Sequence, residues 1–517
     1  MAGCRSVMRH SFLHLAPVLV AVAPLAAQAV ERTDTPRAGA LRVTFDPHTL
    51  VWEQEYTDSG RRYLGSALTD DSATARIPSL ARLQQDVRTL TGIAGYVTSL
   101  GHSLLAVRAE RRVMPIGFDF GVTSRLSIGF TVPIVRVNVR QGFRRTPDGA
   151  NVGLAPNEEF DSLRYTAFFT HFETALTQLQ DSINAGAYGC PVSPECTRAT
   201  AALAQGQALR QALDSAVYGS GNHYLPIAAS EAGRALATLI TGLQRALVDT
   251  FSVTAFGDSL LLPSFGTVAP DDIATLLAAR TSGLGLTPYG ATPRRLRFFT
   301  GDVEVNAKYR FLSHESFAAA AQLVVRLPTG HQESPNDPFD IATGDHQTDV
   351  EGRLTAELTL WHRIWLNAAV RSGRQLAGER DRRVGPVDQF LPATTLARLT
   401  WDPGDYVALD FAPLYRFSAR FAAGVTASYY RQGLDQYGFR SAQDSVVLAT
   451  QMGGPVDLSV LEVGTAVRQS RVGFAVTYAG PRLEGGLSLD RTVSGSGGPV
   501  PVATQFRIVI RQTIVLF

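Results

Sequence analysis

The chain has almost no net charge and no long apolar run. Its 48 Lys and Arg residues nearly balance its 46 Asp and Glu residues over 517 positions, which leaves a formal net charge of +2. This balance excludes a polybasic nucleic-acid binder and a disordered acidic tail. Beyond the N-terminal region, no stretch reaches the ~18 consecutive apolar residues of a membrane helix, which excludes a bundle of membrane helices.

Cysteine is also scarce. Only 3 cysteines occur, and two of them, Cys190 and Cys196, lie in the stretch "CPVSPEC". A zinc site would need further ligands, and His171 and His223 are the only histidines nearby. A disulfide that closes a small loop is therefore favoured over free thiols or a metal site in an exported chain.

The N-terminal region has the form of a secretory signal peptide. Arg5 and Arg9 precede the short apolar run "LAPVLVAVAPLAA", and the stretch "AQA" that ends at Ala29 fits a small-x-small cleavage site. Residues 1–29 are therefore predicted to direct export through the general secretory route and to be removed. A soluble secreted protein and a transmembrane β-barrel remain as alternatives.

The stretch "GDVEVNAKYRF" alternates strictly between an apolar and a charged face. This period of two is typical of a strand that separates two different solvents. The stretch "TDVEGRLTAELTL" repeats the pattern, and together they place Val305 and Leu358 on a lipid face. The charged residues of these stretches are expected on the lumen face, where they are candidates for solute contact. The alternative is that they form cross-strand ion pairs that only fill the barrel. They are Asp302, Glu304, Lys308, Arg310, Glu351, Arg353 and Glu357.

Strand length separates a membrane barrel from a soluble sandwich. Most alternating runs reach the ~9–11 residues of a membrane strand, whereas globular strands average ~5–6. Aromatic residues near strand ends, and short turns opposite long loops, are also typical of outer-membrane barrels. We predict an all-β membrane protein, a closed antiparallel transmembrane β-barrel of about 12–14 strands with a helical insertion, and disfavour 13 because bacterial barrels take even numbers. The stretch "LTWDPGDYVALDF" leaves the count open, because it is either a turn or one bulged strand.

The chain ends in "QFRIVIRQTIVLF", a strand that would invite aggregation as an exposed edge. We expect it to pair with the first strand in a closed ring within lipid. Its terminal aromatic, Phe517, resembles the signal by which barrel-assembly machinery recognises its clients. Arg511 and Thr513 share the face of Phe517, where apolar residues are usual, and a bulge near Gln512 would restore the phase.

A segment of helical character interrupts the strands. Phe168, Phe172, Leu176, Leu179 and Ile183 follow helical spacing, as do the leucines between positions 236 and 247 and the stretch "APDDIATLLAAR". The sequence therefore divides into four parts: residues 1–29, the signal peptide; 30–140, the first barrel strands with a long helical loop; 141–299, a helical insertion that forms an extracellular cap or a lumen plug; and 300–517, the remaining barrel strands.

Several short motifs resemble a known family. They are Gly301-Asp302, Lys308-Tyr309-Arg310, Leu327-Pro328-Thr329-Gly330, Thr343-Gly344 and "LTWDPGDYVALDFAPLYRF". Together they look like the outer-membrane proteins grouped under the meta-pathway of phenol degradation, relatives of the long-chain fatty-acid transporters. The resemblance covers roughly residues 100–140 and 300–517. It implies a porin-like channel for passive uptake of small hydrophobic or aromatic solutes.

Two other function classes are alternatives to a channel. A barrel enzyme needs a nucleophile or an acid–base pair. No G-x-S-x-G elbow is present, which does not exclude such an enzyme, and no catalytic residue is assigned. The acidic loop of His331 and His346 has two interpretations, a divalent-cation site with oxygen ligands and a solvated polar loop. The second is favoured, and the loop lacks the ligand spacing of an EF-hand, so we assign no metal and no cofactor. A barrel that only displays the insertion is the other alternative. The expected partners are outer-membrane lipids and lipopolysaccharide, the barrel-assembly machinery and a small solute, with no nucleic acid.

Overall fold

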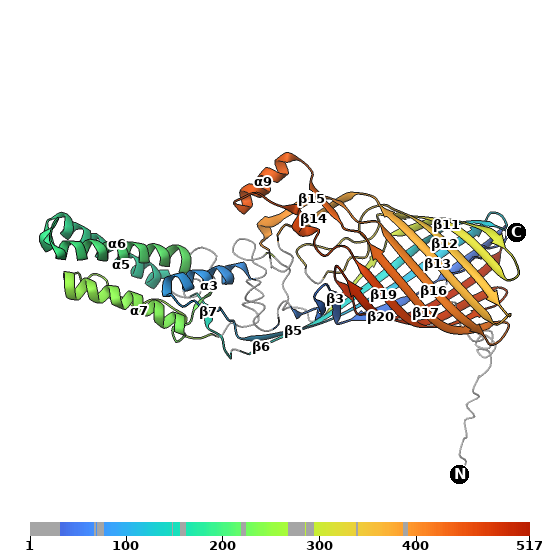
Figure 1. Ribbon diagram of the computed structural model, residues 1–517, viewed down its shortest axis with the longest axis horizontal. Helices are drawn as coiled ribbons and strands as arrows, with labels where there is room; N and C mark the ends of the chain where they lie inside the picture. The colour runs from blue at the N-terminus through green and yellow to red at the C-terminus, as the bar shows by residue number, and fades with distance from the viewer. Residues whose placement is uncertain are drawn as a thin grey trace, which may run out of the picture.

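The computed structural model of the chain is a closed barrel of 12 antiparallel strands with a helical arm at one end (Figure 1). The predicted signal peptide and Phe517 lie outside the described residues. The structure describes residues 31–516 except 67–68, 70–76, 147, 156–161, 219–223, 267–284, 286–293, 338–339 and 386–390.

The last strand closes the barrel against the first, as the sequence predicts. β22 (Thr504–Val515) pairs with β1 (Ala40–Phe45) and with β2 (His48–Trp52), which together fill one position in the wall. In the same way, β9 (Arg294–Thr300) and β10 (Val303–Ser313) together fill the position beside β6. The other wall strands are β5 (His102–Gly121), β6 (Leu126–Thr146), β11 (Phe317–Leu327), β12 (Asp349–Leu360), β13 (Ile364–Gln375), β16 (Tyr406–Arg416), β17 (Phe421–Gln432), β19 (Arg468–Ala479) and β20 (Leu483–Ser496).

The ambiguous stretch "LTWDPGDYVALDF" forms two strands in different sheets. β15 (Leu396–Asp402) leaves the barrel and pairs with β14 (Gly378–Arg383) and β18 (Gln436–Phe439). β16 begins after Pro403, which has no N–H to donate to a strand ladder. The count therefore stays at 12, within the predicted range.

One expectation about the C-terminal strand was wrong. The pairing of β22 with β1 and β20 runs through Gln512 without a shift in register, so the strand has no bulge there. Arg511 lines a cavity in the lumen, and Ile514 is exposed on the outer face. The strand therefore alternates between lumen and lipid up to its described end.

The outer face of the barrel is an apolar band. Val305 is 46% exposed and Leu354 is 57% exposed, although both lie in strands that are paired on each side. Large exposed apolar side chains in a regular, fully paired strand are expected only where the surrounding solvent is itself apolar. The alternation observed in the sequence is thus a division between lipid and lumen.

The two rims of the barrel differ in the length of their connections. The turn rim carries short connections at residues 122–125, 314–316, 361–363, 417–420 and 480–482. The loop rim carries the long ones, which form small structures of their own. These are the β14–β15–β18 sheet with α9 (Ala442–Met452), and the sheet of β3 (Gln54–Thr57), β4 (Gly60–Tyr63) and β21 (Val500–Pro501).

β5 and β6 continue beyond the loop rim and lead to a helical arm, residues 151–266 (Figure 1). The arm contains α5 (Ser162–Asn184), α6 (Pro194–Ala212) and α7 (Glu231–Arg245), with the short strands β7 (Val152–Leu154) and β8 (Tyr224–Pro226). The predicted helix in the first long loop is α3 (Pro78–Thr91). The stretch "APDDIATLLAAR" lies outside the described residues.

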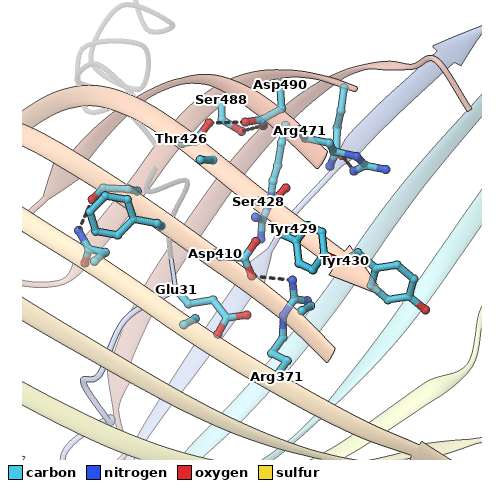
Figure 2. Close-up of a pocket in the computed structure, with 18 of the residues that line it drawn as sticks. Glu31, Arg371, Asp410, Thr426, Ser428, Tyr429, Tyr430, Arg471, Ser488 and Asp490 are labelled. Atoms are coloured by element: carbon cyan, nitrogen blue, oxygen red, sulfur yellow. Dashed lines mark hydrogen bonds and ion pairs between the residues drawn. The ribbon is translucent and has the colours of Figure 1, made fainter. Parts of the chain in front are cut away.

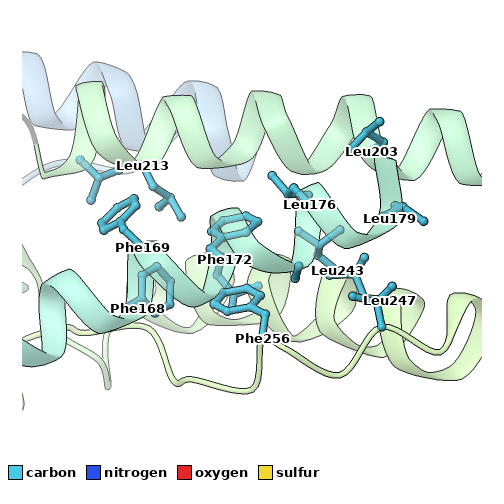
Figure 3. Packing of buried hydrophobic residues seen from close by; sticks show 14 of the residues in the cluster. Phe168, Phe169, Phe172, Leu176, Leu179, Leu203, Leu213, Leu243, Leu247 and Phe256 are labelled. Carbon is cyan, nitrogen blue, oxygen red and sulfur yellow. The ribbon is translucent and has the colours of Figure 1, made fainter. Parts of the chain in front are cut away.

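The helical arm has a hydrophobic core of its own (Figure 3). The ring of Phe172 stacks on that of Phe256 with centroids 4.4 Å apart, and Leu176 and Leu243 pack in the same cluster. Tyr218 donates a hydrogen bond to the carbonyl of Leu261 at 2.6 Å, and burial raises the pKa of its hydroxyl. Among the described residues, no helix is both long and apolar enough to cross a membrane.

The Cys190–Cys196 disulfide predicted from the sequence is present at the start of α6. It closes a small loop in the helical arm, so its stabilising effect is confined to that arm. Replacing both cysteines by serine is expected to lower the stability of the arm by about 2 kcal/mol, from the lost constraint on the unfolded chain. Hydrogen exchange should show faster opening of α6 and unchanged barrel strands, and faster exchange in the barrel would contradict the prediction.

Because Leu354 and Leu327 face lipid, the cost of replacing each by arginine should depend on its depth in the bilayer. Leu354, in the middle of β12, should tolerate arginine poorly, because a charge at the bilayer midplane costs about 2–4 kcal/mol. The same change at Leu327, at the loop-rim end of β11, should cost about 0–1 kcal/mol. Reversible urea unfolding in lipid vesicles measures both variants, and equal costs would show that the membrane position is misassigned.

Candidate functional site

The lumen contains two adjoining cavities of about 530 and 380 Å³. Glu31, Glu304, Arg353 and Arg507 line both of them and therefore stand where the cavities meet. Figure 2 shows the larger cavity, in which polar and charged side chains from several strands point toward one another. The lumen is thus a polar space divided by charged groups.

The residues that precede β1 occupy this lumen. We call residues 31–39 the luminal segment. The N–H of Thr33 donates to Glu357 Oε1 at 2.6 Å, and Lys308 Nζ donates to the carbonyl oxygen of Arg32. Thr33 is fully buried. Since Glu357 and Lys308 belong to β12 and β10, the segment lies inside the barrel, where it narrows the passage.

Arg32 joins the luminal segment to distant parts of the wall. Its guanidinium lies 3.7 Å from Glu357 on β12 and 3.5 Å from Glu484 on β20. It also lies 5.5 Å from the centre of the Trp365 ring. A cation between two carboxylates and an aromatic face is stabilised in a confined site. Because β12 and β20 are not neighbours in the sheet, this contact spans the lumen.

A second ionic cluster centres on Glu351, which is 1% exposed. Its carboxylate accepts a hydrogen bond from Arg326 at 2.9 Å and further bonds from Arg353 and the Tyr406 hydroxyl. Arg326 also lies 2.9 Å from Glu304. A charge removed from water needs such partners, because its desolvation is costly. The cluster therefore fixes this part of the wall.

The larger cavity has further ion pairs along its wall. Arg371 donates to Asp410 at 2.6 Å (Figure 2), and Arg507 lies 2.5 Å from Asp46. Asp490 accepts a hydrogen bond from Ser488 at 2.9 Å. These pairs leave both positive and negative groups at the cavity surface. The lining can therefore contact a solute that carries polar or charged groups.

The structure brings most of the predicted lumen residues together. Glu304, Lys308 and Arg353 line cavities, while Glu351 contacts Arg353 and Glu357 contacts the luminal segment. Arg310 lies apart near the turn rim, where its backbone N–H donates to the carbonyl of Arg125. Their roles in selecting a solute remain proposals.

Asp302 lies at the loop rim and joins the motif residues quoted for the family resemblance. Its carboxylate accepts a hydrogen bond from the N–H of Gly330 at 2.8 Å, and Thr329 Oγ1 donates to the carbonyl of Gly301 at 2.9 Å. A side chain added at Gly344 would come within 2.4 Å of the same carboxylate. Three separate motifs thus meet in one tightly packed junction, which has a structural role.

The acidic loop with His331 forms internal contacts. His331 Nε2 lies 2.7 Å from Asp340 Oδ2, and its ring stacks on Phe299 with centroids 4.2 Å apart. In the part of the chain that the structure describes, no group of three or more His, Cys, Asp or Glu residues is arranged to bind a metal ion.

Sequence reasoning missed several luminal residues. Arg371, Asp410 and Arg507 alternate with apolar residues in their strands, so the same period-2 pattern could have identified them. Glu31 and Arg32 carried no such signal. Their place in the lumen depends on contacts with residues more than 270 positions away.

Comparison with known proteins adds little beyond the architecture. No protein-family model matches the chain, and no curated protein matches it. An outer-membrane channel from Pseudomonas putida F1 is similar at 6% identity and a TM-score of 0.42, covering 94% of this chain and all of that one. The P. putida toluene transporter TodX is similar at 8% identity and a TM-score of 0.29, covering 92% and 89%. At these values the likeness carries no argument about solute, and the family resemblance remains an expectation.

The buried cluster predicts unequal costs for two neutralising changes. Glu351→Gln should lower the free energy of unfolding by about 3 kcal/mol, because it removes the buried charge on which Arg326, Arg353 and Tyr406 converge. Asp410→Asn should cost about 1 kcal/mol or less, because that side chain is 36% exposed and water can replace its partner. Urea titration of both variants in the same vesicles makes the comparison, and equal costs would show that Glu351 is solvated.

Proposed function

We propose that the protein is an outer-membrane channel for passive uptake of small solutes, closed in this structure by the luminal segment. The observation that carries the proposal is the polar lumen with two adjoining cavities, crossed by residues 31–39. The helical arm lies at the far end of the β5–β6 ribbon (Figure 1), away from this passage. The luminal segment is therefore the candidate gate.

The contacts of the luminal segment suit a removable closure. The segment adds no strand to the barrel, so it can leave without breaking the ladder of the wall. Its main attachments are ionic and hydrogen-bonded contacts of Arg32, Thr33 and Asp34. Water can replace polar contacts of this kind once the segment moves, whereas no water can replace a ladder within lipid.

The lining favours a particular solute chemistry. The family resemblance implies hydrophobic or aromatic solutes, while the cavity surface is mostly polar and charged. Tyr430 lines the larger cavity with Arg371 and Arg471, and its ring lies 5.6 Å from that of Tyr406. Guanidinium groups bind carboxylates and aromatic rings stack on aromatic solutes. We infer that the solute combines an aromatic body with an anionic group.

A display scaffold is the second candidate function. The helical arm has its own core and a disulfide, and it extends from the loop rim on two barrel strands. These features suit an element that contacts other molecules. Under this alternative, the lumen stays closed whatever happens to the luminal segment.

A gating experiment tests the channel proposal. The variant Glu31→Ser, Arg32→Ser, Asp34→Ser removes the charged attachments of the luminal segment and leaves every wall residue unchanged. Conductance in planar bilayers should rise severalfold, and liposomes should become permeable to benzoate. The control Glu195→Ser, Arg198→Ser removes an exposed ion pair of the helical arm and should leave conductance unchanged.

One result would overturn the channel proposal, and another would overturn only the inferred solute class. A correctly folded triple variant that conducts no more than the unaltered protein would favour the display scaffold. Equal entry of benzoate and of glucose in the opened variant would retain the channel but refute the inferred solute class. Heat-modifiable migration in detergent gels checks that each variant has formed its barrel.

A further inference from the structure

The outer face of the barrel ends at the loop rim in outward-facing arginines. Arg374 and Arg431 lie near the loop-rim ends of β13 and β17, Arg468 begins β19, and Arg491 lies in the same half of β20. All four side chains are exposed. They extend the outward face of their strands, because their cross-strand neighbours include the exposed apolar residues Val350 and Val472.

Some of these arginines stand opposite each other across the sheet. Arg431 pairs in register with Arg468. Arg112 and Arg136 also stand opposite each other, but Arg112 donates a hydrogen bond to the carboxylate of Glu110, which relieves the repulsion there. Like charges directly opposite one another destabilise a pair of strands. Within the described residues, Arg374, Arg431, Arg468 and Arg491 form no ion pair with a carboxylate, so the repulsion is not relieved within this part of the chain.

The surroundings of the arginines match the boundary of a bilayer. The guanidinium of Arg136 lies 5.9 Å from the ring centre of Phe298, which is 62% exposed. Aromatic rings of this kind mark the level of the headgroups. Below the arginines the outward positions of the same strands are apolar or small, for example Val370, Val425 and Leu487. The arginines therefore lie where hydrocarbon gives way to polar headgroups.

We propose that Arg374, Arg431, Arg468 and Arg491 form an outer arginine girdle that binds the phosphate groups of lipid A in the outer leaflet. Guanidinium groups bind phosphate in bidentate fashion, and a phosphate between paired arginines removes their repulsion. Continuity with the apolar band assigns the ligand to a lipid, since its acyl chains cover the band while its phosphates reach the girdle. The inference rests on the proposed outer-membrane location and is independent of conduction.

The turn rim provides a matched set of arginines. Arg125, Arg363, Arg420 and Arg482 are exposed as well, but they lie in the short turns at the opposite end of the barrel. Replacing these four removes the same charge as replacing the four members of the girdle. A difference between the two sets then reports position and not net charge.

Native mass spectrometry of the full-length protein in detergent tests the proposal, with bis-phosphorylated lipid A as the probe. We expect the affinity for lipid A to fall by about tenfold or more in the variant Arg374→Gln, Arg431→Gln, Arg468→Gln, Arg491→Gln. The variant with Lys at the same four positions should retain most of the binding, because lysine keeps the charge. The turn-rim variant Arg125→Gln, Arg363→Gln, Arg420→Gln, Arg482→Gln should bind like the unaltered protein.

Further comparisons of lipid, salt and variant show whether the phosphates and the girdle arginines are responsible for binding. The proposal is supported if the protein binds dephosphorylated lipid A more weakly than the phosphorylated lipid. It is also supported if raised salt weakens binding of the phosphorylated lipid, because the attraction is electrostatic. Equal binding of the dephosphorylated lipid, an equal loss in the turn-rim variant, or unchanged binding in the girdle variant would each overturn it. These results leave the channel proposal untouched, since conductance of the gating variant is measured separately.

Discussion

Complete pairing of the backbone within hydrocarbon is the constraint on which the rest of the structure depends. An unpaired N–H or C=O in lipid is so costly that a sheet can cross a bilayer only as a closed ring. Here the ring closes through β22, which pairs with β1 at one end and with β2 at the other. The interruptions of the wall, between β1 and β2 and between β9 and β10, are tolerated because each pair of segments shares the same neighbouring strand.

Closure at 12 strands determines the character of the interior. A barrel of this size encloses far less space than a 16–18-stranded porin, and ion pairs and one short segment of chain occupy much of it. The cluster around Glu351 stiffens one side of the wall, whereas the ion pairs of Arg32 reach across to the other. The same polar chemistry therefore has two uses. It fills the lumen where both partners belong to strands, and it holds the luminal segment in place where one partner belongs to residues 31–39.

The outside of the barrel is organised by depth. Apolar residues occupy the middle of the strands, and exposed arginines lie toward the two ends, on the strands near the loop rim and in the turns at the turn rim. Inside the lumen, arginines find carboxylate partners at distances such as 2.6 Å for Arg371 and Asp410. Outside it, Arg431 and Arg468 face each other. Under the proposed girdle, the outer arginines find their partners in the membrane, whereas the luminal ones find them in the protein.

The sequence by itself determined the features that depend on local alternation and spacing. Alternation along residues 304–308 predicted which side chains face the cavities, helical spacing predicted α5 and α7, and the cysteine pair Cys190 and Cys196 predicted the disulfide. Only the tertiary structure decided that β9 and β10 share one position in the wall, that β15 leaves the barrel, and that Arg32 enters the lumen. The physical reason is that alternation is a property of a single strand, whereas pairing partners and closure depend on residues hundreds of positions apart, such as Thr33 and Glu357.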